Sequence, residues 1–222
     1  MTAAMRTSPL AVAVAGRKPE LREVHGMPVP ARFPGERDTW KATIGICDVS
    51  ALVRAGLKGP GAEAWLAARN VPVPAAANSW THAGGGLVAR LARTEFLIED
   101  GCDDVAAARL RAELQAGEPG VYPVIRQDCA LALAGAAVNE LLVQTCNADF
   151  ASQSAADPIV TLTQMVGVSV TVLRDDRGTV PCYRVWCDGT MGPYFWETLI
   201  GIAEELGGGP VGIASLFADT AT

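Results

Sequence analysis

The side chains that could perform acid–base, nucleophilic or metal chemistry are few in this sequence and lie far apart. Only two histidines occur, His25 and His82, and neither has a cysteine, a second histidine or an aspartate at metal-ligand spacing. Asp48 and Ser50 end an otherwise apolar stretch, where turn formation or capping is a more frequent role than catalysis. We therefore expect no catalytic residue and no metal site in this chain.

The six cysteines are scattered through segments that we expect to be strands and helices. Cys182 and Cys187 are separated by four residues, which fits neither a Cys-x-x-Cys redox pair nor a zinc knuckle. Small, buried thiols in a reducing compartment are the better interpretation. The others are Cys47, Cys102, Cys129 and Cys146.

Three consecutive glycines, Gly84 to Gly86, could suggest a phosphate-binding loop. However, they lack the Lys-Ser/Thr of a P-loop and the spacing of a dinucleotide fingerprint. They also join two apolar segments that read as strands, Leu87–Leu91 and the stretch before it, instead of opening a helix. We interpret them as a hairpin turn.

The composition excludes several classes of partner. The 222 residues carry a formal net charge of −6, and no basic stripe with interleaved aromatic residues is visible, so we expect no nucleic-acid partner. No segment has the uninterrupted apolar length of a membrane span, so we expect a cytoplasmic protein without a membrane partner. Half of the residues are hydrophobic, which favours a buried subunit interface, and we expect exposed apolar surface near the N-terminal arm or the strand of Trp186.

The chain is organised around a strand–turn–helix segment that occurs twice. The first copy, Gly45–Leu66, predicts one strand from Gly45 to Leu57, a turn at Gly59-Pro60-Gly61, and a helix. The second copy is Asp128–Cys146. Leu57, Gly59 and Leu66 recur 76 residues later as Leu133, Gly135 and Leu142, which indicates an internal duplication.

The remaining patterns extend both copies to the order β-α-β-β-β-α. Asp103 and Asp104 are expected to cap the last helix of the first half, and a helix from about Pro193 to Leu206 closes the second. We therefore predict an α+β fold of two βαβββα halves related by a pseudo-twofold axis. The predicted domains are an extended N-terminal arm with a short strand or two (1–44), a first half (45–117), a second half (118–209) and a C-terminal tail (210–222).

Several stretches together resemble the glycine-cleavage T-protein family of tetrahydrofolate-dependent aminomethyltransferases and, more closely, the γ subunit of heterotetrameric sarcosine oxidase. The resemblance covers nearly the whole chain, and it implies the fold of the aminomethyltransferase folate-binding domain. No single motif is specific, but their order and spacing are. The stretches are His25–Pro28, Gly45–Ser50, Leu57–Leu66, Leu141–Phe150, Ile159–Arg174 and Tyr194–Gly207.

The departures from the transferase pattern are functionally important. Where the family has an acidic pair after a Gly-Gly turn, this chain has Leu87 to Arg90, and the pterin-binding glutamate falls at Arg184. A guanidinium can only donate hydrogen bonds, so it cannot accept them from the pterin. The His-Met that follows Asp-Val-Ser is replaced by Ala51-Leu52, and the chain stops where transferases continue into further domains.

The resemblance implies a non-catalytic γ-type subunit of sarcosine oxidase or of a related N-methyl amino-acid oxidoreductase, whose partners are a large subunit with a folate domain and a flavoprotein subunit. Tetrahydrofolate and flavin would then belong to the assembled complex, and this chain would bind neither. The alternatives are a stand-alone tetrahydrofolate-dependent aminomethyltransferase and a folate-binding iron–sulfur assembly factor, and it stays open whether an isolated chain forms a homodimer. If a cleft between the halves persists, the residues expected to line it are Asp48, Leu52, Trp80, Arg90 and Arg184.

Overall fold

The computed structural model describes residues 6–217, and their contacts divide them into two compact units. Unit 1 contains the chain as far as Ala51, residues Asp128–Asp157, and the chain from Leu162 onward. Unit 2 contains Leu52–Gln127 and Pro158–Thr161. These boundaries differ from the predicted ones because Ile44 and Ile46 of the N-terminal part share a core with the second half of the sequence.

The N-terminal part of unit 1 begins with helix α1 (Ala11–Ala15) and continues into a hairpin of β1 (Glu20–Val24) and β2 (Met27–Arg32). Two residues connect the strands, His25 at φ +48° and Gly26 at φ +75°. Such paired left-handed residues match the twist of a hairpin. The predicted short strands are present, but α1 adds a helix to the expected extended arm.

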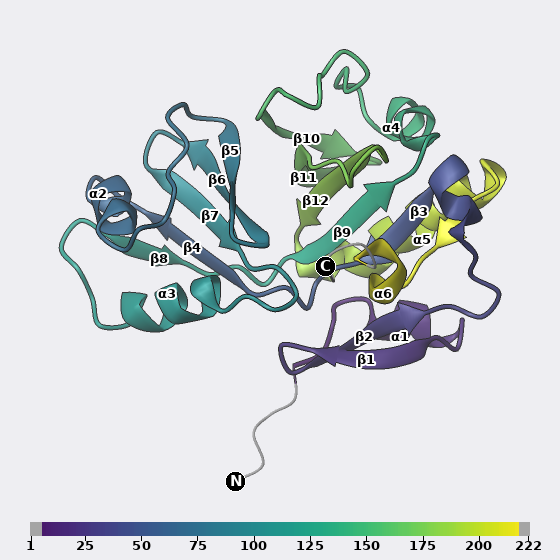
Figure 1. Ribbon diagram of the computed structural model, residues 1–222, viewed down its shortest axis with the longest axis horizontal. Helices are drawn as coiled ribbons and strands as arrows, with labels where there is room; N and C mark the ends of the chain where they lie inside the picture. Colours follow the sequence, from purple (N-terminus) through teal and green to yellow (C-terminus); the bar gives the residue numbers. More distant parts are fainter. Residues whose placement is uncertain (1–5, 218–222) are drawn as a thin grey trace, which may run out of the picture. The chain divides into compact units, whose positions relative to one another are not determined.

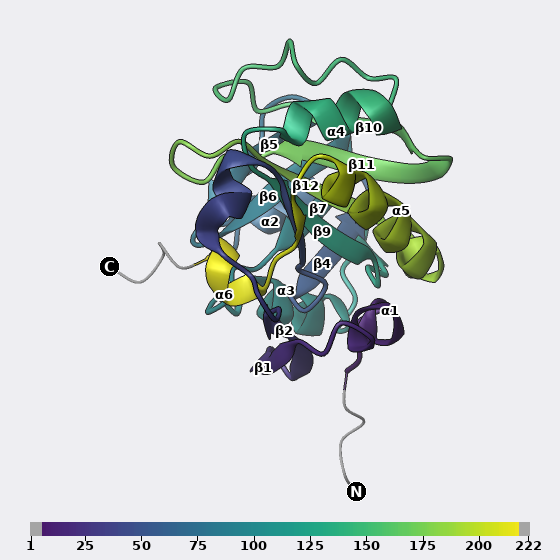
Figure 2. The same cartoon turned by 90° about the vertical axis from the view of Figure 1, so that its right-hand side faces the viewer.

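Unit 1 is built on a six-stranded sheet in the order β10-β11-β12-β9-β3-β13. Helices α1, α4 and α5 lie on one face of this sheet (Figures 1 and 2). Their apolar faces and the facing strand residues form one core. The elements are β3 (Gly45–Asp48), β9 (Cys129–Ala134), α4 (Val138–Thr145), β10 (Val160–Met165), β11 (Val168–Arg174), β12 (Cys182–Cys187), α5 (Gly192–Glu205), β13 (Gly209–Pro210), α6 (Ile213–Leu216) and the 3-10 helices η1 (Asp38–Ala42) and η2 (Gly189–Met191).

Unit 2 is built on a five-stranded sheet in the order β5-β6-β7-β4-β8. Its core joins one face of the sheet to the apolar sides of two helices. The elements are β4 (Arg54–Lys58), α2 (Ala62–Ala67), β5 (Ser79–Ala83), β6 (Gly86–Ala92), β7 (Glu95–Glu99), α3 (Ala106–Leu114) and β8 (Tyr122–Val124). Gly84 and Gly85 form the β5–β6 hairpin turn, as the sequence predicts, and Gly86 is the first residue of β6.

The predicted duplication is present in the chain order and in the strand order of the two sheets. In sequence, β4-α2-β5-β6-β7-α3 corresponds to β9-α4-β10-β11-β12-α5. In the sheets, β5-β6-β7-β4 corresponds to β10-β11-β12-β9. Gly59 (φ +124°) and Gly135 (φ +133°) occupy the two strand-to-helix joints. A side chain at either joint would collide with a backbone carbonyl, of Gly120 or of Thr43, so both joints require glycine.

Two local predictions were wrong. The strand expected from Gly45 to Leu57 is two strands, β3 and β4, in different sheets, because the Asp48 carboxylate accepts the Ser50 N–H and turns the backbone. The expected cap of α3 is Asp100 instead of Asp103 or Asp104: its Oδ1 accepts the Ala107 N–H at 2.7 Å and its Oδ2 the Ala108 N–H at 3.2 Å.

Within residues 6–217, no helix combines the length and apolar character that crossing a membrane requires.

Candidate functional site

Asp48 ends strand β3 and is 1% exposed. Its Oδ2 accepts a hydrogen bond from Ser8 Oγ at 2.6 Å, and its Oδ1 accepts one from the Ser50 N–H at 2.9 Å. Ser50 Oγ in turn accepts the Ala130 N–H at 3.1 Å. The carboxylate therefore ties the N-terminal segment to the sheet, which is the structural role that the sequence favoured.

Two cysteines of unit 1, Cys129 and Cys187, are buried in its core. Cys129 and Cys187 lie directly opposite each other on β9 and β12 and are both buried. The hydrogen bond to Cys187, burial and the negative charge of Asp48 all raise the pKa of the Cys129 thiol. Because the thiolate is the reactive form, the raised pKa makes Cys129 a poor nucleophile, and both side chains pack in the core of unit 1.

Arg184 lies on β12 and is 3% exposed. Its Nη1 is 3.9 Å from Asp175 Oδ2, and the same oxygen is 3.0 Å from Arg177 Nη2. The Arg184 guanidinium also lies 5.9 Å from the centre of the Trp186 ring. Arg184 therefore interacts with side chains inside unit 1. Trp186 is 3% exposed and the rest of β12 is buried, so this strand does not provide the exposed apolar surface that the composition suggested.

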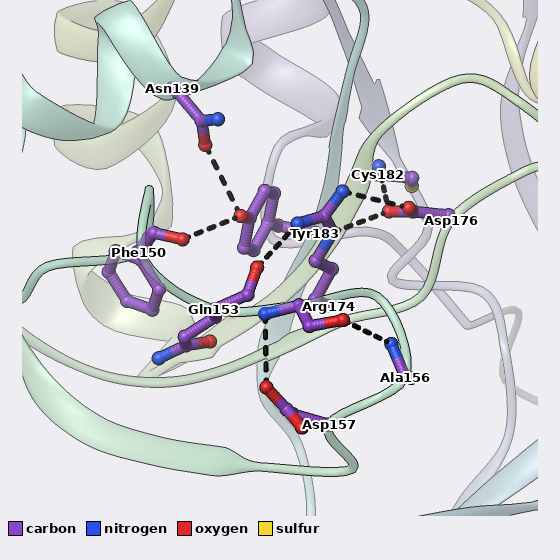
Figure 3. A network of polar contacts seen from close by, with 10 residues as sticks. Asn139, Phe150, Gln153, Ala156, Asp157, Arg174, Asp176, Cys182 and Tyr183 are labelled. Atoms are coloured by element: carbon purple, nitrogen blue, oxygen red, sulfur yellow. Dashed lines mark hydrogen bonds and ion pairs between the residues drawn. The ribbon is translucent and has the colours of Figure 1, made fainter.

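A polar network next to Arg184 holds the loop between α4 and β10 (Figure 3). The Tyr183 hydroxyl bonds to Asn139 Oδ1 at 3.2 Å and to the Phe150 carbonyl oxygen at 3.3 Å. The Phe150 ring meets the Tyr183 ring edge to face, with centroids 5.6 Å apart. Burial raises the pKa of Tyr183, which keeps the phenol neutral as a donor.

Arg174 completes the network from strand β11. Its Nη1 donates to the Gln153 carbonyl oxygen at 2.6 Å, and its Nε and Nη2 bind Asp176 at 2.9 and 3.0 Å. Asp176 also accepts the Cys182 N–H at 3.1 Å, as Figure 3 shows. These bonds fix a loop, and they leave no converging acid and base.

In unit 2, Trp80 and Arg90 lie on opposite faces of the sheet. Trp80 is paired with Ala89 on β6, so Arg90, the next residue, points to the other face. That face carries the helices, and there the Arg90 guanidinium lies 5.2 Å from the centre of the Phe96 ring. The two side chains therefore do not share one face of this sheet.

Arg90 holds the loop after α2 in place through hydrogen bonds. Its Nη1 donates to the carbonyl oxygens of Pro74 and Ala75 at 3.0 and 3.2 Å. Its Nη2 donates to the Arg93 carbonyl oxygen at 2.7 Å and pairs with Glu63 at 2.8 Å. The side chain is 7% exposed, so its role is to close the fold of unit 2.

Asp48 and Arg184 are likewise on opposite faces of the unit 1 sheet. Asp48 is in register with Leu131, whose side chain belongs to the helix-covered core, whereas Arg184 is in register with Ala132. Leu52 is buried in unit 2. In each unit, two of the predicted lining residues thus lie on opposite faces of the sheet.

Sequence reasoning missed a buried ion pair on the helix-free face of the unit 2 sheet. Arg54 and Glu99 are direct partners on β4 and β7, with Nη1 3.0 Å from Oε2 and side chains 3% and 1% exposed. Trp80 lies on the same face, and its Nε1 is buried without a hydrogen-bond partner among the described residues. Charged residues inside apolar strands were the signal that could have indicated this pair.

A surface groove of about 400 Å³ lies at the β13 edge of unit 1. Glu36 stabilises one wall, because its Oε2 accepts the N–H groups of Phe33 and Gly212 at 2.8 and 2.9 Å. Its other carboxylate oxygen, Oε1, is buried and has no hydrogen-bond partner among the described residues. The lining residues are Arg17, Phe33–Arg37, Thr39, Trp40, Thr43 and Gly207–Val211.

Among the described residues, no group of three or more histidine, cysteine, aspartate or glutamate side chains is placed to hold a metal ion.

No protein-family model matches the sequence, and no curated protein matches it. Solved structures do match the fold. The glycine cleavage system aminomethyltransferase T from Bartonella henselae superposes with a TM-score of 0.70 at 16% identity, over 96% of this chain and 61% of that chain. A chain of the heterotetrameric sarcosine oxidase from Corynebacterium sp. U-96, solved with pyrrole 2-carboxylate, superposes with a TM-score of 0.65 at 22% identity, over 90% of this chain and 96% of that one.

Both likenesses confirm the predicted α+β, aminomethyltransferase-like fold. This chain spans less than two thirds of the aminomethyltransferase.

Proposed function

We propose that this chain, with its aminomethyltransferase-like fold, is a non-catalytic γ-type subunit of a heterotetrameric sarcosine oxidase or a related N-methyl amino-acid oxidoreductase. In the proposed assembly it packs on the folate domain of the large subunit, beside a flavoprotein subunit. The observation that carries the proposal is the likeness to the sarcosine oxidase chain, which extends over 90% of this chain and 96% of that one.

The engagement of the polar side chains supports a non-catalytic role. Asp48 forms a turn, Arg90 closes a loop and Arg184 pairs with Asp175. The resemblance expects a pterin-binding acceptor at Arg184, and a guanidinium has only donors, so the residues present do not fit a pterin there. We therefore propose that this chain itself binds neither tetrahydrofolate nor flavin.

The six free cysteines support a cytoplasmic location for the proposed complex, because five of them are buried thiols of the kind typical of reducing compartments.

A stand-alone tetrahydrofolate-dependent aminomethyltransferase is the second candidate. The TM-score of 0.70 to the Bartonella henselae enzyme, over 96% of this chain, favours it. The two candidates differ in what the isolated chain binds, since a transferase must bind tetrahydrofolate without partners.

Co-purification and calorimetry test the proposal together. An affinity-tagged chain expressed in the organism that encodes it should retain subunits that carry a flavin absorbance band and oxidise an N-methyl amino acid. The isolated chain should show no saturable heat with tetrahydrofolate. A chain that purifies alone and binds tetrahydrofolate saturably would refute the subunit proposal and favour the transferase.

A further inference from the structure

Gly201 occupies an exposed position in the middle of α5, and the packing of unit 1 does not explain it. A β-carbon built at this position would meet no atom within 4 Å. Its φ is not in the left-handed region, so any residue could adopt its backbone conformation. Because glycine is less favourable than alanine inside a helix, the local fold alone would select another residue.

Exposed apolar side chains also occur on each of the three helices of this layer. Figure 2 shows α5 between α4 and α1, on one face of the unit 1 sheet. Val12 on α1 is 88% exposed, Val143 on α4 is 73% exposed, and Tyr194 on α5 is 51% exposed. The Tyr194 hydroxyl donates to the Val166 carbonyl oxygen at 3.1 Å, which holds the ring in place. We call Val12, Val143, Tyr194 and Gly201 the helix-layer surface.

The charged side chains of α4 and α5, next to the helix-layer surface, are all negative. Helices α4 and α5 contain no lysine or arginine, and they expose Glu140, Glu197, Glu204 and Glu205. Two of these carboxylates, Glu204 and Glu205, lie in the last turn of α5, where the negative end of the helix dipole disfavours them. Arg17 pairs with Glu204 at 2.8 Å, but both side chains are well exposed, so the pair is weak compensation.

We infer that the helix-layer surface docks an amphipathic helix of another subunit, with an apolar stripe flanked by lysine or arginine. This inference rests on the proposed function and names the surface through which the assembly forms. On α5, Gly201 leaves a gap between Thr198 and Glu205, into which a side-chain ridge of a partner helix fits. The apolar stripe covers Val143 and Tyr194, and the basic flank neutralises the carboxylates at the end of α5.

A substitution that adds a large side chain at Gly201 tests the inference. In the tagged chain, Gly201→Gln fills the gap with a good helix former, so the chain should fold at least as stably as the wild type. Its recovery of partner subunits should fall by about ten-fold or more. The matched control is Ala112→Gln, a similar increase in bulk at an exposed position of α3 in unit 2, which should leave recovery unchanged. Wild-type recovery with Gly201→Gln would overturn the inference.

A photo-crosslinking benzophenone side chain at Val143 identifies the occupant in the purified complex. The crosslinked peptide should come from a helix of another subunit that carries basic residues on its flanks. Crosslinks to a second copy of this chain, to loops alone, or to nothing would overturn the inference. Oxidase subunits that co-purify without such a crosslink leave the proposed function intact, whereas a crosslinked basic helix from a protein with no flavin or oxidase activity refutes only the proposed function.

Discussion

Arg54 and Glu99 face each other across β4 and β7, with Nη1 3.0 Å from Oε2 and both side chains almost fully buried. Removal of one partner leaves a buried charge, which costs about 3–5 kcal/mol, whereas apolar replacement of both is often close to neutral. We expect Glu99→Gln to lower the free energy of unfolding by about 3 kcal/mol and the double variant Arg54→Met/Glu99→Leu to recover most of it. Urea denaturation measures both. A loss below about 1 kcal/mol for Glu99→Gln would mean that the pair is not desolvated.

Arg90 should matter for stability and not for ligand binding. Arg90→Met removes the donors to Pro74, Ala75 and Arg93 and leaves their carbonyl oxygens without these bonds. We expect a loss of about 2–3 kcal/mol in the free energy of unfolding. Glu63→Gln is the control, because its carboxylate is 56% exposed and its pairing with Arg90 contributes about 1 kcal/mol or less. Equal losses in the free energy of unfolding for the two variants would contradict the role of the Arg90 hydrogen bonds to these carbonyl oxygens.

Gly135 should tolerate no side chain. Its φ of +133° disfavours any other residue, and a β-carbon would lie 2.7 Å from the Trp40 carbonyl oxygen. We expect Gly135→Ala to cost more than about 2 kcal/mol in thermal or urea unfolding. Gly117→Ala is the matched control, since Gly117 also has positive φ (+77°) but nothing within 4 Å, and it should cost about 1 kcal/mol. If both variants cost the same, the close approach at the joint is unimportant.

Stability should decrease in alkaline solution because of buried thiols. Burial raises the pKa of the Cys182 thiol from 9.0 to about 12. Between these values the unfolded chain has lost this proton while the folded chain keeps it, so the free energy of unfolding falls as pH rises. Urea unfolding from about pH 8 to about pH 11 should show this decline, and Cys182→Ala should make it shallower.

The duplication could be predicted because the same residue types recur at the same local positions in both copies. Glycines at the strand-to-helix joints and apolar residues at a constant spacing of 76 survive in both copies, and β4 to α3 and β9 to α5 follow the same order. The break after β3 could not be predicted in this way. The stretch from Gly45 to Leu57 is largely apolar on both sides of Asp48 and Ser50. Only the hydrogen bond from the Ser50 N–H to Asp48 shows where the chain leaves one sheet for the other.

The arrangement of the candidate site was less predictable, because strand register decides which residues share a face. Trp80 and Arg90 are on different strands, and the pairing of Trp80 with Ala89 turns Arg90 to the opposite face. A resemblance places residues along the chain but does not give the register of a new sequence. Arg54 and Glu99 were overlooked because each is an isolated charge in an apolar strand, and they become a pair only when β4 meets β7.

The position of β3 determines the order in which the protein can form during synthesis on the ribosome. Strand β3 is made early, at residues 45–48, but its neighbours in the sheet are β9 and β13, and β13 is completed only at Pro210. The sheet of unit 2 needs nothing beyond Val124. The five strands of the unit 2 sheet can therefore pair while the chain is still emerging, whereas the second edge of β3, the strand that contains Ile46, has no partner strand until Pro210 has been made.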